Sequence, residues 1–250
     1  MSAGRRARRG VSLYPTRARR EPRKEVMAVR AVIFDFDGVI VETEEPFYLA
    51  WREVWASFGQ DLALEEWATC IGTGLGPGTF DPFSELLRRT GQDLDQAEIR
   101  ARTRRVAAPL LDSSTLRPGV ADWLGEADAA GLPVAIASSS PRSWIEEHLD
   151  RLDLATRFPV VACFDDCGVT KPDPASYLLA CRQLGIAPTE GLAVEDSLHG
   201  VKAAKSAGLA CVAVPTEMTA HLDLGLADLV LPSLAEATLA GTIERFAAWG

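Results

Sequence analysis

The sequence predicts an α/β fold of the doubly wound kind, with a mainly parallel sheet and an inserted α-helical cap domain. Two observations predict the sheet: short apolar runs recur along the chain, and helical patterns separate most of them. Strands that alternate with helices pair in parallel and are covered by helices. A third observation predicts the cap, because a long stretch without a strand pattern follows the first apolar run directly.

The apolar runs have the length and composition of strands that are buried on both faces. The expected strands cover residues 31–34, 133–137, 160–163, 192–194, 209–214 and 229–231.

Helix signals lie between these strands. The expected helices cover residues 120–130, 174–184 and 198–207, and one more begins at Pro141. Proline is favoured in the first position of a helix because an N–H group there has no partner within the helix. Glycine follows three of the patterns, at Gly131, Gly185 and Gly208, and readily adopts the left-handed conformation that ends a helix.

Residues 44–112 contain helical patterns and no convincing strand. Four aromatic residues, Phe47, Trp51, Trp55 and Phe58, recur at helical spacing and are expected to form the core of a small helical bundle. Such a bundle, inserted after the first strand, lies over the edge of the sheet where α/β folds bind ligands. We therefore expect a catalytic core of residues 27–43 and 113–250 and a helical cap of residues 44–112.

A loop is expected inside the cap, where Gly72, Gly74, Gly76 and Gly78 alternate with other residues. A dinucleotide-binding turn places its glycines directly after a strand and at the start of a helix. This loop does neither, so it gives no indication of a dinucleotide cofactor.

Charge is unevenly distributed over the 250 residues, whose formal net charge is −9 at pH 7. Residues 1–30 are basic, with nine Arg and one Lys against two Glu, and the remainder is acidic. An acidic body disfavours nucleic acid and anionic membrane surfaces as partners. No run of 18 apolar residues predicts a membrane span. We expect no nucleic-acid or membrane partner, and a monomer or weak dimer.

Residues 1–26 are Arg-rich and have no apolar periodicity. We expect a disordered leader, or translated sequence upstream of a true start near Met27. A transit peptide and a basic arm for nucleic acid are the alternatives.

The five cysteines are odd in number and lack zinc-like spacing, which favours reduced thiols and a cytoplasmic location. Cys163 and Cys167 lie four positions apart, but no His is near them in the sequence. We expect no metal site at these two cysteines.

Two carboxylates follow the first expected strand, in the sequence Asp35-Phe36-Asp37-Gly38. Side chains alternate along a strand, so these two point in the same direction. Two like charges that lie close together are unfavourable unless a cation or a shared proton relieves them. Mg²⁺ suits this role because it binds carboxylate, water and phosphate oxygens. A pair of solvated turn residues is the structural alternative.

A second acidic pair, Glu195 and Asp196, follows the strand expected at residues 192–194, with a helix N-cap at Asp196 as the alternative. Lys171 lies in the sequence Lys-Pro-Asp-Pro, after the strand expected at residues 160–163. The flanking prolines make a stiff loop that can hold a cation in place. A surface lysine is the alternative interpretation.

Three hydroxyls, Ser138, Ser139 and Ser140, follow the strand expected at residues 133–137. The N–H groups at the start of the next helix, together with a hydroxyl, can hold phosphate oxygens. Ser140 can also serve as a helix cap alone.

These four strand ends together resemble the haloacid dehalogenase-like superfamily of phosphohydrolases, in the branch with a helical cap after the first strand. The matching segments are Asp35-Phe36-Asp37-Gly38-Val39, Ser138-Ser139, Lys171-Pro172-Asp173-Pro174 and Glu195-Asp196-Ser197-x-x-Gly200. The resemblance runs from about Arg30 to Leu231 and is specific for the superfamily rather than for a substrate. It implies a Mg²⁺-dependent phosphatase that hydrolyses a small-molecule phosphate monoester through an aspartyl-phosphate.

The resemblance also implies a role for each matching residue. Asp35 would be the nucleophile, and Asp37 would protonate the leaving oxygen and then activate water. Ser138 and Ser139 would contact phosphate oxygens. Lys171 would bind the phosphate and neutralise its charge and that of Asp35.

The implied cofactor is Mg²⁺. Its implied ligands are Asp35, the backbone carbonyl of Asp37, and Asp196. Glu195 would contact the ion through water or orient one of its ligands.

Several rival functions fit the residues less well. Metal-free dehalogenases of this fold lack an acid at the position of Asp37, and the related phosphonate-cleaving enzymes need a cap Lys, whereas no Lys lies between Glu25 and Thr170. A response-regulator receiver also phosphorylates an Asp, but it is about half this length and has no helical insert. A catalytically silent binding protein remains as a non-enzymatic alternative.

A sugar-like phosphate is the favoured substrate, with a nucleotide or phosphoglycolate as alternatives. A phosphosugar mutase similar to β-phosphoglucomutase is the nearest enzymatic rival. In that family a cap His contacts the acid/base Asp and a cap Arg holds the second phosphate, whereas Phe47 stands at the aligned His position and residues 71–75 contain no cation. Arg88 and Arg89 align poorly with the Arg. The sequence therefore favours hydrolysis over isomerisation.

Overall fold

The computed structural model describes residues 28–72 and 80–249, together with Met1. The expected leader at residues 1–26 lies outside the described residues apart from Met1, and so do Gly74, Gly76 and Gly78 of the expected cap loop.

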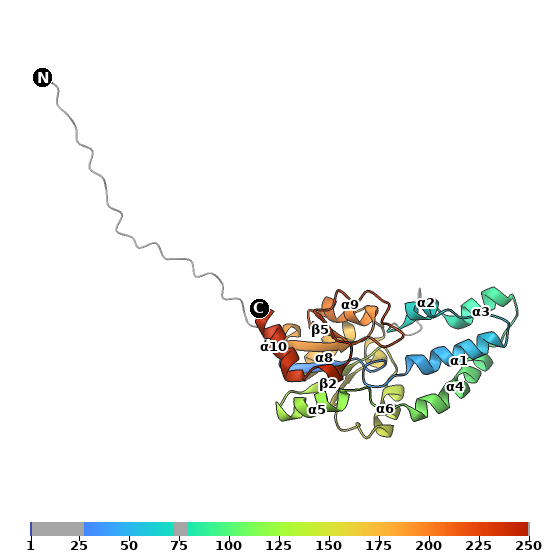
Figure 1. Ribbon diagram of the computed structural model, residues 1–250, viewed down its shortest axis with the longest axis horizontal. Coiled ribbons are helices and arrows are strands. Elements are labelled where there is room, and N and C mark those ends of the chain that lie inside the picture. Colours follow the sequence, from blue (N-terminus) through green and yellow to red (C-terminus); the bar gives the residue numbers. More distant parts are fainter. Residues whose placement is uncertain (2–27, 73–79, 250) are drawn as a thin grey trace.

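A single six-stranded sheet forms the centre of the molecule, and each pair of neighbouring strands is parallel (Figure 1). The strands are β1 (Ala31–Phe34), β2 (Val134–Ala137), β3 (Val160–Ala162), β4 (Gly191–Glu195), β5 (Ala210–Ala213) and β6 (Leu229–Val230). Their order across the sheet is β3-β2-β1-β4-β5-β6. The predicted doubly wound α/β fold is therefore confirmed, and every expected strand is present within a residue or two.

Helices cover both faces of the sheet. On one face α5 (Val120–Ala129), α6 (Arg142–Arg151) and α10 (Leu239–Trp249) pack on β-strand residues such as Val32 and Phe34. On the other face α8 (Ala175–Leu184) and α9 (Leu198–Ala207) pack on residues such as Ile33 and Ala193. Figure 1 shows α9 on the side of the sheet opposite to α5 and α6.

The helix boundaries follow the sequence signals with small shifts. Pro141 and Pro174 precede α6 and α8 as N-cap residues, one position before the first helical residue. Gly185 and Gly208 end α8 and α9 with φ of 69° and 91°, which is the left-handed conformation that glycine favours. Short helices that the sequence pattern did not predict are α7 (Phe164–Cys167), η2 (Pro188–Glu190) and η3 (Leu234–Glu236), and α10 was not predicted either.

Residues between β1 and α5 form helices at one end of the sheet, and the described part of this insert contains no named strand (Figure 1). These are α1 (Glu44–Ala56), α2 (Leu64–Trp67), η1 (Ala68–Cys70), α3 (Pro82–Thr90) and α4 (Gln96–Ser113). Trp51 and Trp55 belong to the buried core of this insert, whereas Phe47 and Phe58 are only partly buried at its margin. The aromatic pattern thus predicted two core residues and two that face outward from it.

The strand order reverses direction between β1 and β4, which lie side by side in the middle of the sheet. Doubly wound sheets bind ligands in the crevice outside the carboxyl ends of the strands at such a point. Phe34 pairs with Val194, so the polar residues that follow β1 and end β4 meet there.

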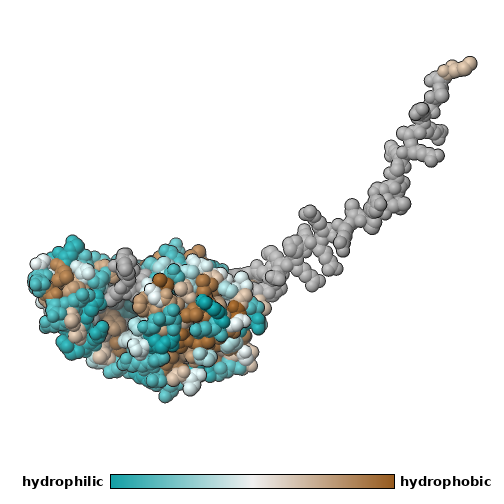
Figure 2. Space-filling model, turned by 180° about the vertical axis from the view of Figure 1, so that it is seen from behind, coloured by the Kyte–Doolittle hydropathy of each residue, from teal (hydrophilic) through white to brown (hydrophobic). Residues whose placement is uncertain are grey.

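The face in Figure 2 is mainly hydrophilic over the helical insert, and hydrophobic residues gather more over the sheet-bearing part. No helix among the described residues is long and apolar enough to span a membrane.

Candidate active site

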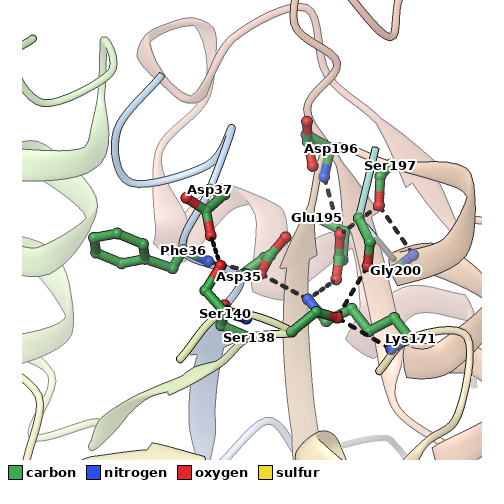
Figure 3. A network of polar contacts seen from close by, with 12 residues as sticks. Asp35, Phe36, Asp37, Ser138, Ser140, Lys171, Glu195, Asp196, Ser197 and Gly200 are labelled. Carbon is green, nitrogen blue, oxygen red and sulfur yellow. Dashed lines mark hydrogen bonds and ion pairs between the residues drawn. The ribbon is translucent and has the colours of Figure 1, made fainter. Parts of the chain in front are cut away.

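Side chains from four segments meet at the carboxyl edge of the sheet (Figure 3). Asp35 follows β1, Ser138 follows β2, Lys171 precedes α8, and Glu195 and Asp196 lie at the end of β4. All five are buried. The structure therefore brings together the residues that the four sequence motifs singled out.

Lys171 is the centre of this buried cluster. Its Nζ lies 2.7 Å from Oδ1 of Asp35 and 2.6 Å from Oε1 of Glu195, and its side chain is 1% exposed. The hydroxyl of Tyr177 on α8 donates to the same Oε1 of Glu195, at 2.6 Å. Lys171 is thus a buried cation between two carboxylates, and the alternative of a surface lysine is wrong.

Burial and neighbouring charge perturb the ionisation of this cluster. Burial, with the charge of Glu195, raises the pKa of Asp35 to about 8, although Lys171 opposes the shift. Burial and the charges of Asp35 and Glu195 raise the pKa of Asp196 well above its usual value. Burial acts to lower the pKa of Lys171, but the two carboxylates it contacts outweigh this and raise the pKa. More negative charge is gathered here than one lysine neutralises.

The cluster fits a divalent cation. One carboxylate oxygen from each of Asp35, Glu195 and Asp196 lies within 4.8 Å of the others. Both carboxylate oxygens of Asp196 are buried, and neither has a hydrogen-bond partner within the described part of the chain. A buried carboxylate without a partner is costly. Oxygen ligands on a hard cation such as Mg²⁺ remove that cost.

Gly38 is required at this point of the site. Its φ is +77°, and a Cβ atom on it would lie 2.3 Å from Oδ2 of Asp196. Gly200 has the same relation to Glu195, because a Cβ atom there would lie 1.9 Å from Oε2. The glycines of both motifs therefore leave room for carboxylates.

Glu195 is held by the protein itself. Oε1 accepts from Lys171 and Tyr177, and Oε2 accepts from the backbone N–H of Asp196 at 3.2 Å. These contacts agree better with a residue that orients Lys171 and Asp196 than with one that binds an ion alone.

Asp37 points away from the cluster and into a cavity. Its Oδ1 accepts from the hydroxyl of Thr43 at 2.7 Å and from the indole N–H of Trp144 at 2.9 Å. Its Oδ2 accepts from the hydroxyl of Ser140 at 2.5 Å, as Figure 3 shows. The two aspartates of the first motif thus have different surroundings, one beside Lys171 and one facing open space.

The three serines after β2 have three different environments. The hydroxyl of Ser138 accepts from the backbone N–H of Ser140 at 3.0 Å, which leaves its own proton for another acceptor. The hydroxyl of Ser139 donates to the carbonyl of Gly72 and accepts from the backbone N–H of Lys171, both at 3.0 Å. The Ser139 hydroxyl is therefore occupied by the protein, and a substrate contact through this side chain is not supported.

Gly72 brings the insert into contact with the sheet-bearing part. Besides its hydrogen bond from Ser139, it has φ of +81°, and a Cβ atom on it would lie 2.2 Å from Oγ of Ser197. A side chain at this position cannot be accommodated without movement. Gly72 is thus a point of close approach, and not simply part of a flexible loop.

A cavity of about 850 Å³ lies between the insert and the sheet edge. Asp37, Ser140 and Trp144 line it from the sheet side, and Phe47 and Trp51 line it from the insert. Its walls are aromatic and apolar over much of their area, with polar groups near Asp37. The cavity has room for a substrate much larger than the phosphate group itself.

The sequence patterns missed several residues of this cavity. Trp144 lies in the first turn of α6, where an apolar residue is expected to belong to the core, and nothing in its spacing indicated Asp37 as a partner. Arg100 and Arg104 also line the cavity from α4. The expectation that no cap arginine could reach the substrate considered only Arg88 and Arg89, and this part of the argument against a mutase is wrong.

Fold and site together define an α/β enzyme with a buried acidic centre, a fixed lysine and a helical insert over the ligand crevice. Residues 29–208 match the family described as haloacid dehalogenase-like hydrolase, and the chain belongs to this family.

Relatives extend the match over most of the chain. The chain is 40% identical over 217 residues to a Bacillus subtilis protein named "Putative phosphatase YhcW", covering 87% of this chain and 97% of the relative. It is 33% identical over 181 residues to the phosphorylated carbohydrates phosphatase of Thermotoga maritima, covering 72% of this chain and 82% of that protein.

A solved structure has the same arrangement. The crystal structure of CbbY from Rhodobacter sphaeroides in complex with xylulose-1,5-bisphosphate is similar with a TM-score of 0.70 at 33% identity. The similarity covers 85% of this chain and 98% of that one.

Proposed function

We propose that this protein is a Mg²⁺-dependent phosphatase that hydrolyses small phosphate monoesters, with sugar-like phosphates foremost. The buried cluster around Lys171, with the unpartnered carboxylate of Asp196 and with Asp37 beside it, is the observation that supports this best. The proposed core consists of residues 27–43 and 113–250, and the proposed cap of residues 44–112.

Asp35 is the nucleophile in this proposal. Its Oδ1 accepts from Lys171 and from the backbone N–H of Phe36, both at 2.7 Å, which leaves Oδ2 to attack phosphorus. As the new Oδ2–P bond forms, the ester P–O bond breaks and Asp37 gives its proton to the leaving oxygen. The products of this step are an alcohol and an aspartyl-phosphate on Asp35.

The second step restores the enzyme. Asp37, now a carboxylate, takes a proton from a water molecule whose oxygen attacks the phosphorus, and the bond to Asp35 breaks. Lys171 and the hydroxyl of Ser138 stabilise the phosphate oxygens in both steps. Mg²⁺, held by Asp35, Asp196 and the backbone carbonyl of Asp37, supplies positive charge beside the phosphoryl group when it is bound.

The cavity supports a substrate of sugar size. Its aromatic walls suit the apolar face of a sugar ring, and Arg100 and Arg104 can contact hydroxyl or anionic groups far from the reacting phosphate. The phosphorylated-carbohydrate relative supports the same class. Phosphoglycolate would leave most of the cavity empty, and a nucleotide remains an alternative.

The setting that we propose is the cytoplasm. The five cysteines all lie within the described residues and form no disulfide. We also propose a monomer or weak dimer without nucleic-acid or membrane partners, because the acidic body disfavours them.

Removing divalent metal is expected to abolish phosphate release, and adding Mg²⁺ is expected to restore it. In the absence of activity measurements, Mg²⁺ should also raise the melting temperature, because it binds the folded protein and relieves the buried charge of Asp196. Asp196→Asn is the matched control, in which the rise in melting temperature should disappear. Full turnover in a chelator would contradict the proposed mechanism.

Hydrolysis is expected to dominate over isomerisation. Arg100 and Arg104 favour a mutase as the second candidate, since they can hold a distal phosphate. However, Phe47 provides no proton donor or acceptor toward Asp37, so no cap residue of this kind delays hydrolysis. The test is β-glucose 1-phosphate with catalytic glucose 1,6-bisphosphate. Free phosphate should appear faster than glucose 6-phosphate, and the reverse order would make the protein a mutase.

A further inference from the structure

The carboxylate of Asp37 is held by three donors, and these are unevenly divided. Thr43 and Trp144 both donate to Oδ1, whereas Ser140 donates to Oδ2. The two oxygens of this carboxylate are therefore in different environments before any substrate binds.

The three donors also differ in chemistry. A Ser or Thr hydroxyl can turn and become an acceptor, but the indole N–H can only donate. If the proton of Asp37 were on Oδ1, it would point toward donors, and Trp144 could not adapt. With the proton on Oδ2, the hydroxyl of Ser140 can turn to accept it while Oδ1 keeps both of its hydrogen bonds.

The indole of Trp144 is fixed by its neighbours. Its ring lies 4.1 Å from the ring of His148, one turn later on α6, and 5.7 Å from the ring of Phe47 on α1. Nδ1 of His148 lies 3.0 Å from the backbone carbonyl of Trp144. A ring packed in this way keeps its N–H direction, so it can define the rotation of the Asp37 carboxylate.

We propose that Trp144 is a positioning residue for Asp37, and that it reserves Oδ1 as an acceptor so that Oδ2 exchanges the proton with the substrate. This rests on the proposed phosphatase function. In the first step the proton leaves Oδ2 for the leaving oxygen as the ester P–O bond breaks, and Oδ1 keeps its bonds to Trp144 and Thr43. Asp37, Ser140 and Trp144 all line the cavity in which that leaving oxygen lies.

The test is Trp144→Phe, which removes the N–H and keeps an aromatic ring against Phe47 and His148. An alkyl phosphate and 2,4-dinitrophenyl phosphate serve as substrates, and kcat/KM is measured because it reports the steps up to transfer to Asp35. An alkoxide needs a proton to leave, whereas dinitrophenolate does not. We expect kcat/KM to fall by about 10- to 100-fold for the alkyl ester and by less than about threefold for the dinitrophenyl ester.

Trp123→Phe is the matched control. The indole N–H of Trp123 donates to the backbone carbonyls of Leu234 and Ala237, in the core and away from the cavity. This variant should lower the melting temperature but leave the ratio of the two kcat/KM values unchanged.

Equal losses for both esters in Trp144→Phe, or no loss for either, would overturn the positioning role while the phosphatase function stands. A wild-type protein that releases no phosphate from either ester with Mg²⁺ would instead overturn the phosphatase function itself, and with it the positioning role.

Discussion

Replacing Asp35 with Asn is expected to lower turnover by at least about 10³-fold, which is the scale on which loss of an essential catalytic group acts. The amide is nearly the same size as the carboxylate but cannot attack phosphorus. Lys171 keeps its contact with Glu195, so the site should retain its shape.

The same variant should fold at least as well as the wild type in metal-free buffer at neutral pH. Burial and Glu195 raise the pKa of Asp35 to about 8, which shows that the charged carboxylate is unfavourable where it lies. A carboxyl group with a raised pKa favours the folded state at low pH, and this contribution declines as the pH rises from its unfolded pKa toward 8. Asn has no such charge.

Phosphate release and thermal melting are the measurements for Asp35→Asn, with mass spectrometry to exclude deamidation back to Asp. Asp122→Asn, at an exposed carboxylate on α5, is the matched control and should keep wild-type turnover. Activity of Asp35→Asn within tenfold of wild type would rule out Asp35 as the nucleophile.

Replacing Lys171 with Met is expected to lower both turnover and stability. Removing one partner of a buried ion pair leaves its carboxylates uncompensated, at a cost of about 3–5 kcal/mol. Lys171 neutralises two of them, Asp35 and Glu195. Because the pKa of Lys171 is raised, its contribution is fully present at and below neutral pH and is lost only as the pH rises through the folded pKa. We expect turnover to fall by about 10²-fold or more.

Urea unfolding and phosphate release measure these two effects. Lys205→Met is the matched control, because Lys205 also contacts a carboxylate, Asp228, at 2.6 Å, but is 27% exposed on its side chain. That pair should contribute about 1 kcal/mol or less. If Lys171→Met were no less stable than Lys205→Met, Lys171 would not be the neutralising cation of the site.

The sheet was predictable because its strands are short apolar runs that are buried on both faces. Strand β1 has the expected bounds, and β5 and β6 differ by one residue at one or both ends. α10 was missed because no strand follows the helix to mark it as part of the alternation. Residues 44–112 were predicted as helical, but only packing determined that Trp51 and Trp55 face the core while Phe47 faces Trp144.

Sequence alone gave good grounds for the acidic site, because Asp35, Lys171 and Asp196 each follow an apolar strand, and parallel strands end at one edge. It left open whether Lys171 was buried or solvated. That depended on Glu195 and Tyr177, which hold the ammonium inside the core.

The sequence by itself determined the fold class and the set of charged groups at the sheet edge, because periodicity and strand-end position are local properties of the chain. Tertiary structure alone decided how Asp37 is held. Ser140 and Trp144 are 103 and 107 positions from it in the sequence, and their contact depends on how β1, β2 and α6 pack. Ser139 shows the same limit, since packing against Gly72 and Lys171 occupies its hydroxyl. Hydrogen-bond partners are set by distances and angles that no sequence spacing encodes, because they arise only when separate elements meet.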